Sequence, residues 1–249
     1  MRLQAAITVL ALLLAGCGTA RSQAQQPRAA ATPHPQRYAV LANADNEREH
    51  KENIALAYRT LRALGFEEGN IFIVSPKDRR HPTEKRTPVC SPSPAHFAQV
   101  MDRLAAITHT GDRVVIYGTG HGDFDDQGVF LVLRHGVLAP EDLRTEVERL
   151  PANVIVIMDQ CFSGGFVDAF AGTRSKAIVI SDVDSKHETY CRYFAEAFWD
   201  AFLHDHQTSV RQAFDAAMKV HQKELANDTD LKTDGEYKYF NGFTDAKLN

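Results

Sequence analysis

The sequence contains no cluster of basic residues and few cysteines, and both absences narrow the possible functions. With a net charge of −4 and no basic run, the chain lacks the positive surface that nucleic-acid binding requires, so nucleic acid is not an expected partner. Four cysteines are too few for a disulfide framework. No internal repeat is visible. With 249 residues, of which 44% are hydrophobic, the chain is expected to bury one sizeable core in a single α/β domain.

The longest apolar stretch near the N-terminus is too short to span a bilayer comfortably. It covers residues 5–14, which is the length of a secretory signal. It ends in Leu14-Ala15-Gly16-Cys17, which resembles the lipobox of bacterial lipoproteins; an ordinary secretory signal that contains a cysteine is the alternative. The resemblance implies a signal peptide over residues 1–17 and a lipid anchor on Cys17. Because Gly18 follows and not aspartate, we expect the anchor in the outer membrane, facing the periplasm.

Residues 18–36 are rich in Ala, Gln, Pro, Arg and Ser and are expected to form a disordered tether, followed by one folded domain over residues 37–249. Within that domain, short apolar runs predict strands and amphipathic segments predict helices. The expected strands are 37–42, 70–74, 114–117, 154–158 and 176–181, with a small hairpin over 129–133 and 137–138. The expected helices are 47–64, 95–108, 140–150, 190–203 and 209–225, with loops at 77–94 and 123–128 and no assignment after 225. This alternation predicts a three-layer α/β/α sandwich with about six mostly parallel strands.

Two of the expected strands end in reactive side chains. The strand 114–117 is followed by a glycine-rich turn that contains His121, and the strand 154–158 is followed by a turn that contains Cys161. In an open parallel sheet the carboxyl ends of the strands border the ligand crevice, so adjacent strands would bring a nucleophile and a base together. The competing interpretations are a buried structural thiol and a core histidine.

The same two turns suggest how the thiol would be activated. A helix expected just after Cys161 would favour the thiolate through its dipole, and the backbone N–H groups of Gly122 and Cys161 are the expected oxyanion donors. Motifs and the order of the two residues exclude other folds that carry a catalytic nucleophile. Position 159 is Asp, so no G-x-S-x-G motif is present, and the histidine precedes the cysteine, unlike in papain-like enzymes. No lysine follows Gly165, as a phosphate-binding loop would require.

With these features the chain resembles the caspase-like clan of cysteine peptidases. The segment Tyr117-Gly118-Thr119-Gly120-His121-Gly122 is similar to the metacaspase His motif, and Asp159-Gln160-Cys161-Phe162-Ser163-Gly164 is similar to the Cys motif of metacaspases and the legumain-like family. The spacing from His50 through Tyr58 to Asn70-Ile71 resembles the N-terminal pattern of legumain. The resemblance implies a cysteine endopeptidase that acts on peptides or proteins through a Cys–His dyad and an acyl-enzyme, without a cofactor or metal. A legumain-type transpeptidase and a catalytically silent binding module are the alternatives.

The resemblance also implies a substrate pocket. Asp159 would lie at its floor, although an N-cap role is the alternative, and His50, Glu49 and Ser181 are the other expected substrate-binding residues. Glu49 stands where the legumain family has an arginine. Two carboxylates without a fixed cation predict a preference for arginine or lysine before the cleaved bond. The legumain family takes asparagine before the cleaved bond, and its arginine contributes to that pocket. If Arg48 reached the pocket of this chain, the resemblance would imply the same preference for asparagine.

Two further interpretations concern metal ions and thiols. Asp123, Asp125 and Asp126 form an acidic segment that would suit calcium, but without EF-hand spacing a solvated loop is the favoured interpretation. Cys90 and Cys191 are candidates for a disulfide in an oxidising compartment.

Overall fold

A seven-stranded sheet forms the middle layer of the structure, a computed structural model that describes residues 34–76, 88–228, 231 and 233–249. Its strand order is β10-β9-β8-β4-β1-β2-β3, and β10 alone runs antiparallel to its neighbour. The strands are β1 (Arg37–Asn43), β2 (Ile71–Val74), β3 (Val89–Cys90), β4 (Arg113–Thr119), β8 (Asn153–Asp159), β9 (Ala177–Ser181) and β10 (Tyr237–Phe240). A second sheet contains β5 (Gly122–Asp125), β6 (Gly128–Leu133) and β7 (Gly136–Leu138).

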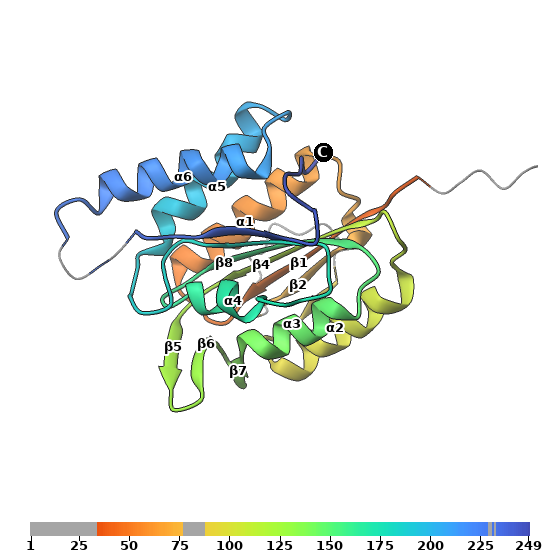
Figure 1. The fold of residues 1–249 in the computed structure, drawn as a ribbon, viewed down its shortest axis with the longest axis horizontal. Helices are drawn as coiled ribbons and strands as arrows, with labels where there is room; N and C mark the ends of the chain where they lie inside the picture. Colours follow the sequence, from red (N-terminus) through yellow and green to blue (C-terminus); the bar gives the residue numbers. More distant parts are fainter. Residues whose placement is uncertain (1–33, 77–87, 229–230, 232) are drawn as a thin grey trace, which may run out of the picture. The chain divides into compact units, whose positions relative to one another are not determined.

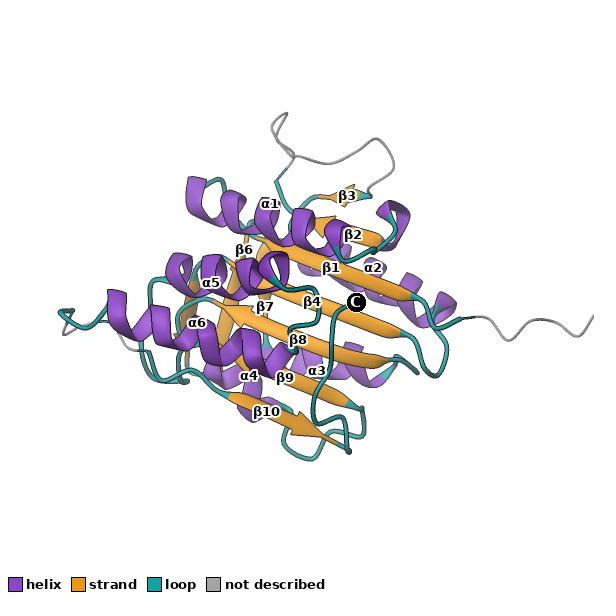
Figure 2. Ribbon diagram, turned by 90° about the horizontal axis from the view of Figure 1, so that it is seen from above, coloured by secondary structure: helices purple, strands orange, loops and turns teal. Residues whose placement is uncertain are grey.

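Six α-helices cover the two faces of the large sheet, which confirms the expected three-layer α/β/α architecture for residues 35–249 (Figures 1 and 2). One face carries α1 (Arg48–Ala63), α5 (Cys191–His204) and α6 (Val210–Glu224). The other carries α2 (Pro94–Ile107), α3 (Pro140–Glu148) and the short α4 (Gly164–Ala169). A 3₁₀ turn, η1 (Glu68–Asn70), precedes β2. None of the helices in the described ranges is long and apolar enough to cross a membrane.

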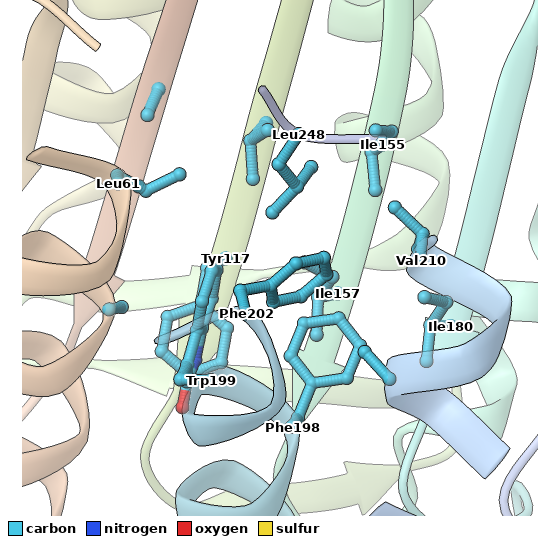
Figure 3. Packing of buried hydrophobic residues seen from close by; sticks show 14 of the residues in the cluster. Leu61, Tyr117, Ile155, Ile157, Ile180, Phe198, Trp199, Phe202, Val210 and Leu248 are labelled. Atoms are coloured by element: carbon cyan, nitrogen blue, oxygen red, sulfur yellow. The ribbon is translucent and has the colours of Figure 1, made fainter. Parts of the chain in front are cut away.

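The core forms because both faces of the central strands are apolar. Alternate residues of β4 and β8 point to opposite faces, and from Val114 and Val154 onward both strands are fully covered. On the face of α1, α5 and α6, Trp199 packs edge-on against Tyr117 of β4 and lies among the phenylalanines of α5 (Figure 3). This packing anchors β4, which ends two residues before His121.

Local sequence explains where the helices begin. α6 starts with a capping box, in which Ser209 accepts from the backbone of Gln212 and the Gln212 side chain accepts from the backbone of Ser209. α2 starts after Ser93, which accepts a hydrogen bond from the His96 backbone. Both helices lie close to the ranges expected from their amphipathic spacing.

Three strands were not expected. The acidic segment 123–128 contributes to β5 through pairing with β6, although aspartate has low strand propensity. β3 has two residues in the expected loop 77–94, and β10 lies in the unassigned C-terminal segment. Short edge strands depend on their partners more than on their own sequence. The expected lipobox, the tether up to residue 33 and residues 77–87 of the expected loop lie outside the described residues.

Candidate catalytic site

The structure brings the His121 and Cys161 turns together at the carboxyl edge of the sheet. β4 and β8 are adjacent and parallel, and Thr119 lies opposite Asp159, so each reactive residue follows its paired strand residue by two positions. The turns touch through Gly122, since a Cβ atom built on it would overlap with the Cys161 carbonyl group. Only glycine permits this contact between the two backbones.

His121 is held by groups from the start of α1. Its Nε2 lies 2.9 Å from Glu47 Oε1, and its ring contacts His50 edge-to-face with the centroids 5.3 Å apart. His50 Nδ1 in turn lies 2.7 Å from Asp45 Oδ2. The His121 side chain remains 57% exposed, so substrate can reach it.

The contact with Glu47 selects one form of the imidazole. A carboxylate accepts hydrogen bonds, so it favours the form of His121 with its proton on Nε2. Nδ1 then has a free lone pair and is available as a base. Glu47 was not among the residues expected from the sequence, because its contact depends on how α1 packs across the sheet.

Cys161 is held from the opposite side by the segment before α5. The Thr189 N–H donates a hydrogen bond to Sγ of Cys161, and the thiol donates one to the Thr189 carbonyl oxygen. Each bond is 3.5 Å long. The Thr189 hydroxyl shares a 2.8 Å hydrogen bond with Nε2 of the buried His221. Phe162, next to Cys161, has a φ of 61°, which is unusual for a residue with a side chain and marks a tightly held turn.

The expected stabilisation of a Cys161 thiolate by a helix dipole is wrong for the resting site. α4 begins three residues later, at Gly164, and has six residues. Burial raises the pKa of the Cys161 thiol, and the negative charges of Asp182 and Glu188 raise it further, against the lowering effect of the Thr189 N–H. These contributions favour the protonated thiol, so Cys161 would need a neighbouring base to become a nucleophile.

A buried carboxyl pair lies next to Cys161 on the face of α1 and α5. Asp159 accepts a 2.7 Å hydrogen bond from the Tyr117 hydroxyl, and Asp182 accepts one of the same length from the Ser163 hydroxyl. Asp159 Oδ1 and Asp182 Oδ2 are buried and have no hydrogen-bond partner among the described residues, so burial favours the protonated form of both carboxyl groups. Burial and the charge of Asp182 raise the pKa of Asp159 well above its ordinary value, and burial raises the pKa of Asp182 to about 7.

This pair predicts a pH-dependent stability difference. Because the pKa of Asp182 is about 7 in the folded protein and 3.8 without perturbation, its contribution to stability is lost as pH rises through 7. The Asp182→Asn variant should therefore gain stability relative to wild type as pH rises from about 4 to about 7, by at most ~4 kcal/mol. Urea unfolding of both proteins across this range measures the difference.

The comparison between the two proteins is needed because His221 acts in the opposite direction. Burial lowers the pKa of His221 to about 4, so its contribution to stability is lost as pH falls below the ordinary histidine value of 6.5. The two effects overlap when the free energy of unfolding of wild type is plotted against pH. The difference in this free energy between wild type and Asp182→Asn isolates the effect of the carboxyl pair. A difference that stays constant, or that favours wild type more strongly at high pH, would contradict the raised pKa of Asp182.

Several expected substrate-binding residues have other roles. Ser181 is fully buried, and its hydroxyl accepts a hydrogen bond from the Glu236 backbone, so the expected contact with substrate is wrong. Asp159 is also fully buried and does not line an open pocket. Glu49 accepts a hydrogen bond from the Tyr190 hydroxyl. Arg48 has an 88% exposed side chain and pairs with Glu52, so the alternative in which it enters the pocket gains no support.

The remaining expectations concern His50, the acidic segment and the second thiol. His50 is buried beside His121, and not exposed as a first-turn residue of a surface helix would be. Within the described residues, the one group of three potential metal ligands contains Asp45, His50 and His121, and does not include Asp123, Asp125 or Asp126. Cys90 is a free thiol, so the disulfide considered for it is not formed.

No protein-family model matches the sequence, and no curated protein matches it. The fold is similar to that of protein GSU0716 from Geobacter sulfurreducens, a structural-genomics crystal structure, with a TM-score of 0.61. The two chains are 12% identical, and the match covers 86% of this chain and 98% of the other. This likeness establishes the α/β fold. Fold and site together define an α/β/α protein with an imidazole and a thiol at the ends of adjacent parallel strands.

Proposed function

We propose that the protein is a cysteine endopeptidase of the cell envelope that acts through Cys161 and His121. The observation that carries the proposal is the register of β4 and β8, which delivers both residues to touching turns at the carboxyl edge of the sheet. Glu47 supports it by favouring the tautomer in which His121 Nδ1 is a base. Neither contact is needed for a merely structural cysteine and histidine.

The proposed reaction proceeds through an acyl-enzyme. His121 takes the thiol proton while Cys161 Sγ attacks the peptide carbonyl, and the N–H groups of Cys161 and Gly122 are the proposed donors to the oxyanion. His121 then gives its proton to the leaving amine as the C–N bond breaks. A water molecule attacks the thioester, His121 takes its proton, and the return of that proton to Sγ releases the carboxylic acid.

The charges around Cys161 favour a cationic side chain before the cleaved bond. Asp182 and Glu188 both raise the pKa of Cys161, so the site is electronegative. A bound cation would offset these charges and would also favour the thiolate. Asp182 is fully buried and Glu188 is exposed, so the attraction is at most that of an exposed ion pair, up to about 1 kcal/mol, and peptides ending in Arg or Lys should be cleaved up to about fivefold faster than Asn or Asp peptides.

A panel of four matched fluorogenic peptides tests both the activity and this preference. The Asp182→Asn variant keeps the shape of the site but removes one carboxylate, so it should narrow the gap between the Arg and Asn peptides. Faster turnover of the Asn peptide by wild type would contradict the electrostatic argument. Absence of turnover of any peptide would favour a silent binding module, and product formed only with an added amine would favour a transpeptidase.

The proposed location depends on Cys17, which lies outside the described residues. A lipid on Cys17 would anchor the domain through a tether that reaches roughly 25 Å on average. The Cys17→Ala variant should therefore move from the membrane fraction to the soluble fraction, whereas Cys90→Ala should remain with the membranes. Immunoblots of the two fractions measure this. Equal membrane association of Cys17→Ala and wild type would argue for another anchor.

A further inference from the structure

We infer that Asp45, His50 and His121 form a binding site for a divalent transition-metal ion, with Zn²⁺ the best-suited ion, and that metal binding there silences His121. One ligand atom from each residue lies within 4.8 Å of the other two. Two imidazoles and a carboxylate suit Zn²⁺ and its neighbours in the first transition row, whereas Ca²⁺ and Mg²⁺ require oxygen ligands. The inhibitory part of this inference rests on the proposed function, but the binding part does not.

The fold organises these three residues in advance. β1 and β4 are adjacent and parallel with Asn43 opposite Thr119, so Asp45 and His121 each follow a paired residue by two positions. His50 is buried at the start of α1, and its Nδ1 is already 2.7 Å from Asp45 Oδ2. Two of the three donors therefore already lie side by side, and a metal would replace the proton between them and move them apart to the ligand spacing.

Only modest movement is needed to complete the site. Zinc bonds of ~2.0–2.2 Å in a tetrahedral arrangement place ligand atoms roughly 3.3 Å apart. The more exposed His121 ring can close the difference by side-chain rotation. A cleft of about 390 Å³ opens beside Asp45 and His121 and gives access from solvent. The fourth position is left to water or to Glu47, which already contacts His121 Nε2.

Metal binding and catalysis would compete for the same imidazole. Nε2 of His121 is the nitrogen that faces the carboxylate of Glu47. A metal on Nε2 replaces the proton there, and neutral imidazole then carries its proton on Nδ1. Nδ1 would no longer have the lone pair that accepts the Cys161 proton. The site would be switched off without any change in the fold, and a chelator would restore it.

The binding test requires no enzymatic activity. Zn²⁺ affinity of the purified protein is measured by competition with a chromophoric indicator, in a background in which all four cysteines of the chain are replaced by serine. One equivalent should bind. Asp45→Asn and His50→Gln should each weaken binding at least about tenfold. His187→Gln is the matched control. His187 Nδ1 also lies 2.8 Å from a carboxylate oxygen, Asp184 Oδ1, but His187 is not in the three-ligand group.

Thermal unfolding of each variant without metal checks that it is folded. Absence of zinc binding in the serine background, including binding seen only in wild type, or equal affinity in the ligand variants and the control would each overturn the site. In an active preparation, Zn²⁺ should inhibit peptide cleavage reversibly, and Asp45→Asn should raise the half-inhibitory concentration at least tenfold. Zinc binding without any peptidase activity would refute the proposed function and leave the metal site standing.

Discussion

The Cys161→Ala variant should lose peptide cleavage by at least a factor of about 10³, because the proposed acyl-enzyme has no other nucleophile. Cys161→Ser should be similarly inactive, since a hydroxyl is far less acidic than a thiol. His121→Ala should cost a comparable factor, because the two residues act as a unit. Steady-state hydrolysis of the best peptide of the panel measures all three variants.

Matched controls separate loss of chemistry from loss of structure. Cys90→Ala removes the other free thiol within the described residues, and His109→Ala removes an exposed imidazole that follows α2. Both should retain near wild-type activity. Unfolding midpoints of Cys161→Ala and wild type should be similar, because the Cys161 side chain is only partly buried. Activity that survived in Cys161→Ala would assign the nucleophile to another residue.

The Gly122→Ala variant should lose activity by at least ~10², even though both catalytic side chains remain. The added Cβ would overlap with the Cys161 carbonyl oxygen and lie 2.8 Å from its carbonyl carbon and 2.9 Å from Gln160 Cγ. The two turns must separate to relieve this overlap. Overpacking of this kind also costs typically ~1–3 kcal/mol of stability.

Gly69→Ala is the matched control for this variant. Gly69 lies in η1, has no atom within 4 Å of an added Cβ and does not have a positive φ. It should therefore retain activity and stability. Kinetics and urea unfolding of the two variants, measured side by side, test the contact between the turns. Full activity in Gly122→Ala would show that the turns do not need to touch.

Much of the fold follows from patterns that are local in the sequence. The strand–helix alternation predicts the three layers, and the positions of His121 and Cys161 just after two buried strands place them at one edge of the sheet. This inference needs only that parallel strands align their carboxyl ends. It does not reveal which strands are neighbours, and β10 and β3 were missed because they form only through pairing with the rest of the sheet.

The surroundings of the two residues depend on contacts between distant segments. Glu47 reaches His121 only because α1 packs across β1 and β4, and Thr189 reaches Cys161 from a loop 28 residues away. The period-two alternation of β4 and β8 places Tyr117 and Asp159 on the face of α1, but it does not reveal that Asp182 lies beside them. The raised pKa values arise from burial, which only the assembled layers reveal.

The same contacts alter one argument made from the sequence. The preference for a cationic substrate was expected from Asp159 and Glu49 in an open pocket. In the structure Asp159 is fully buried with a raised pKa, while Glu49 binds the Tyr190 hydroxyl. The preference now depends on the charges of Asp182 and Glu188 near the thiol. It remains a prediction, with a different electrostatic origin.

Covalent labelling of Cys161 tests the central claim most directly. A peptidyl acyloxymethyl ketone ending in arginine reacts with a thiol that a neighbouring base activates, and releases its carboxylate as the thioether forms. Mass spectrometry of wild type should show one adduct, located on the peptide that contains Cys161 and absent from Cys90. His121→Ala should slow labelling strongly, whereas His109→Ala should not. Labelling of Cys161 at the same rate in His121→Ala, or no labelling in folded wild type, would contradict the proposed pair.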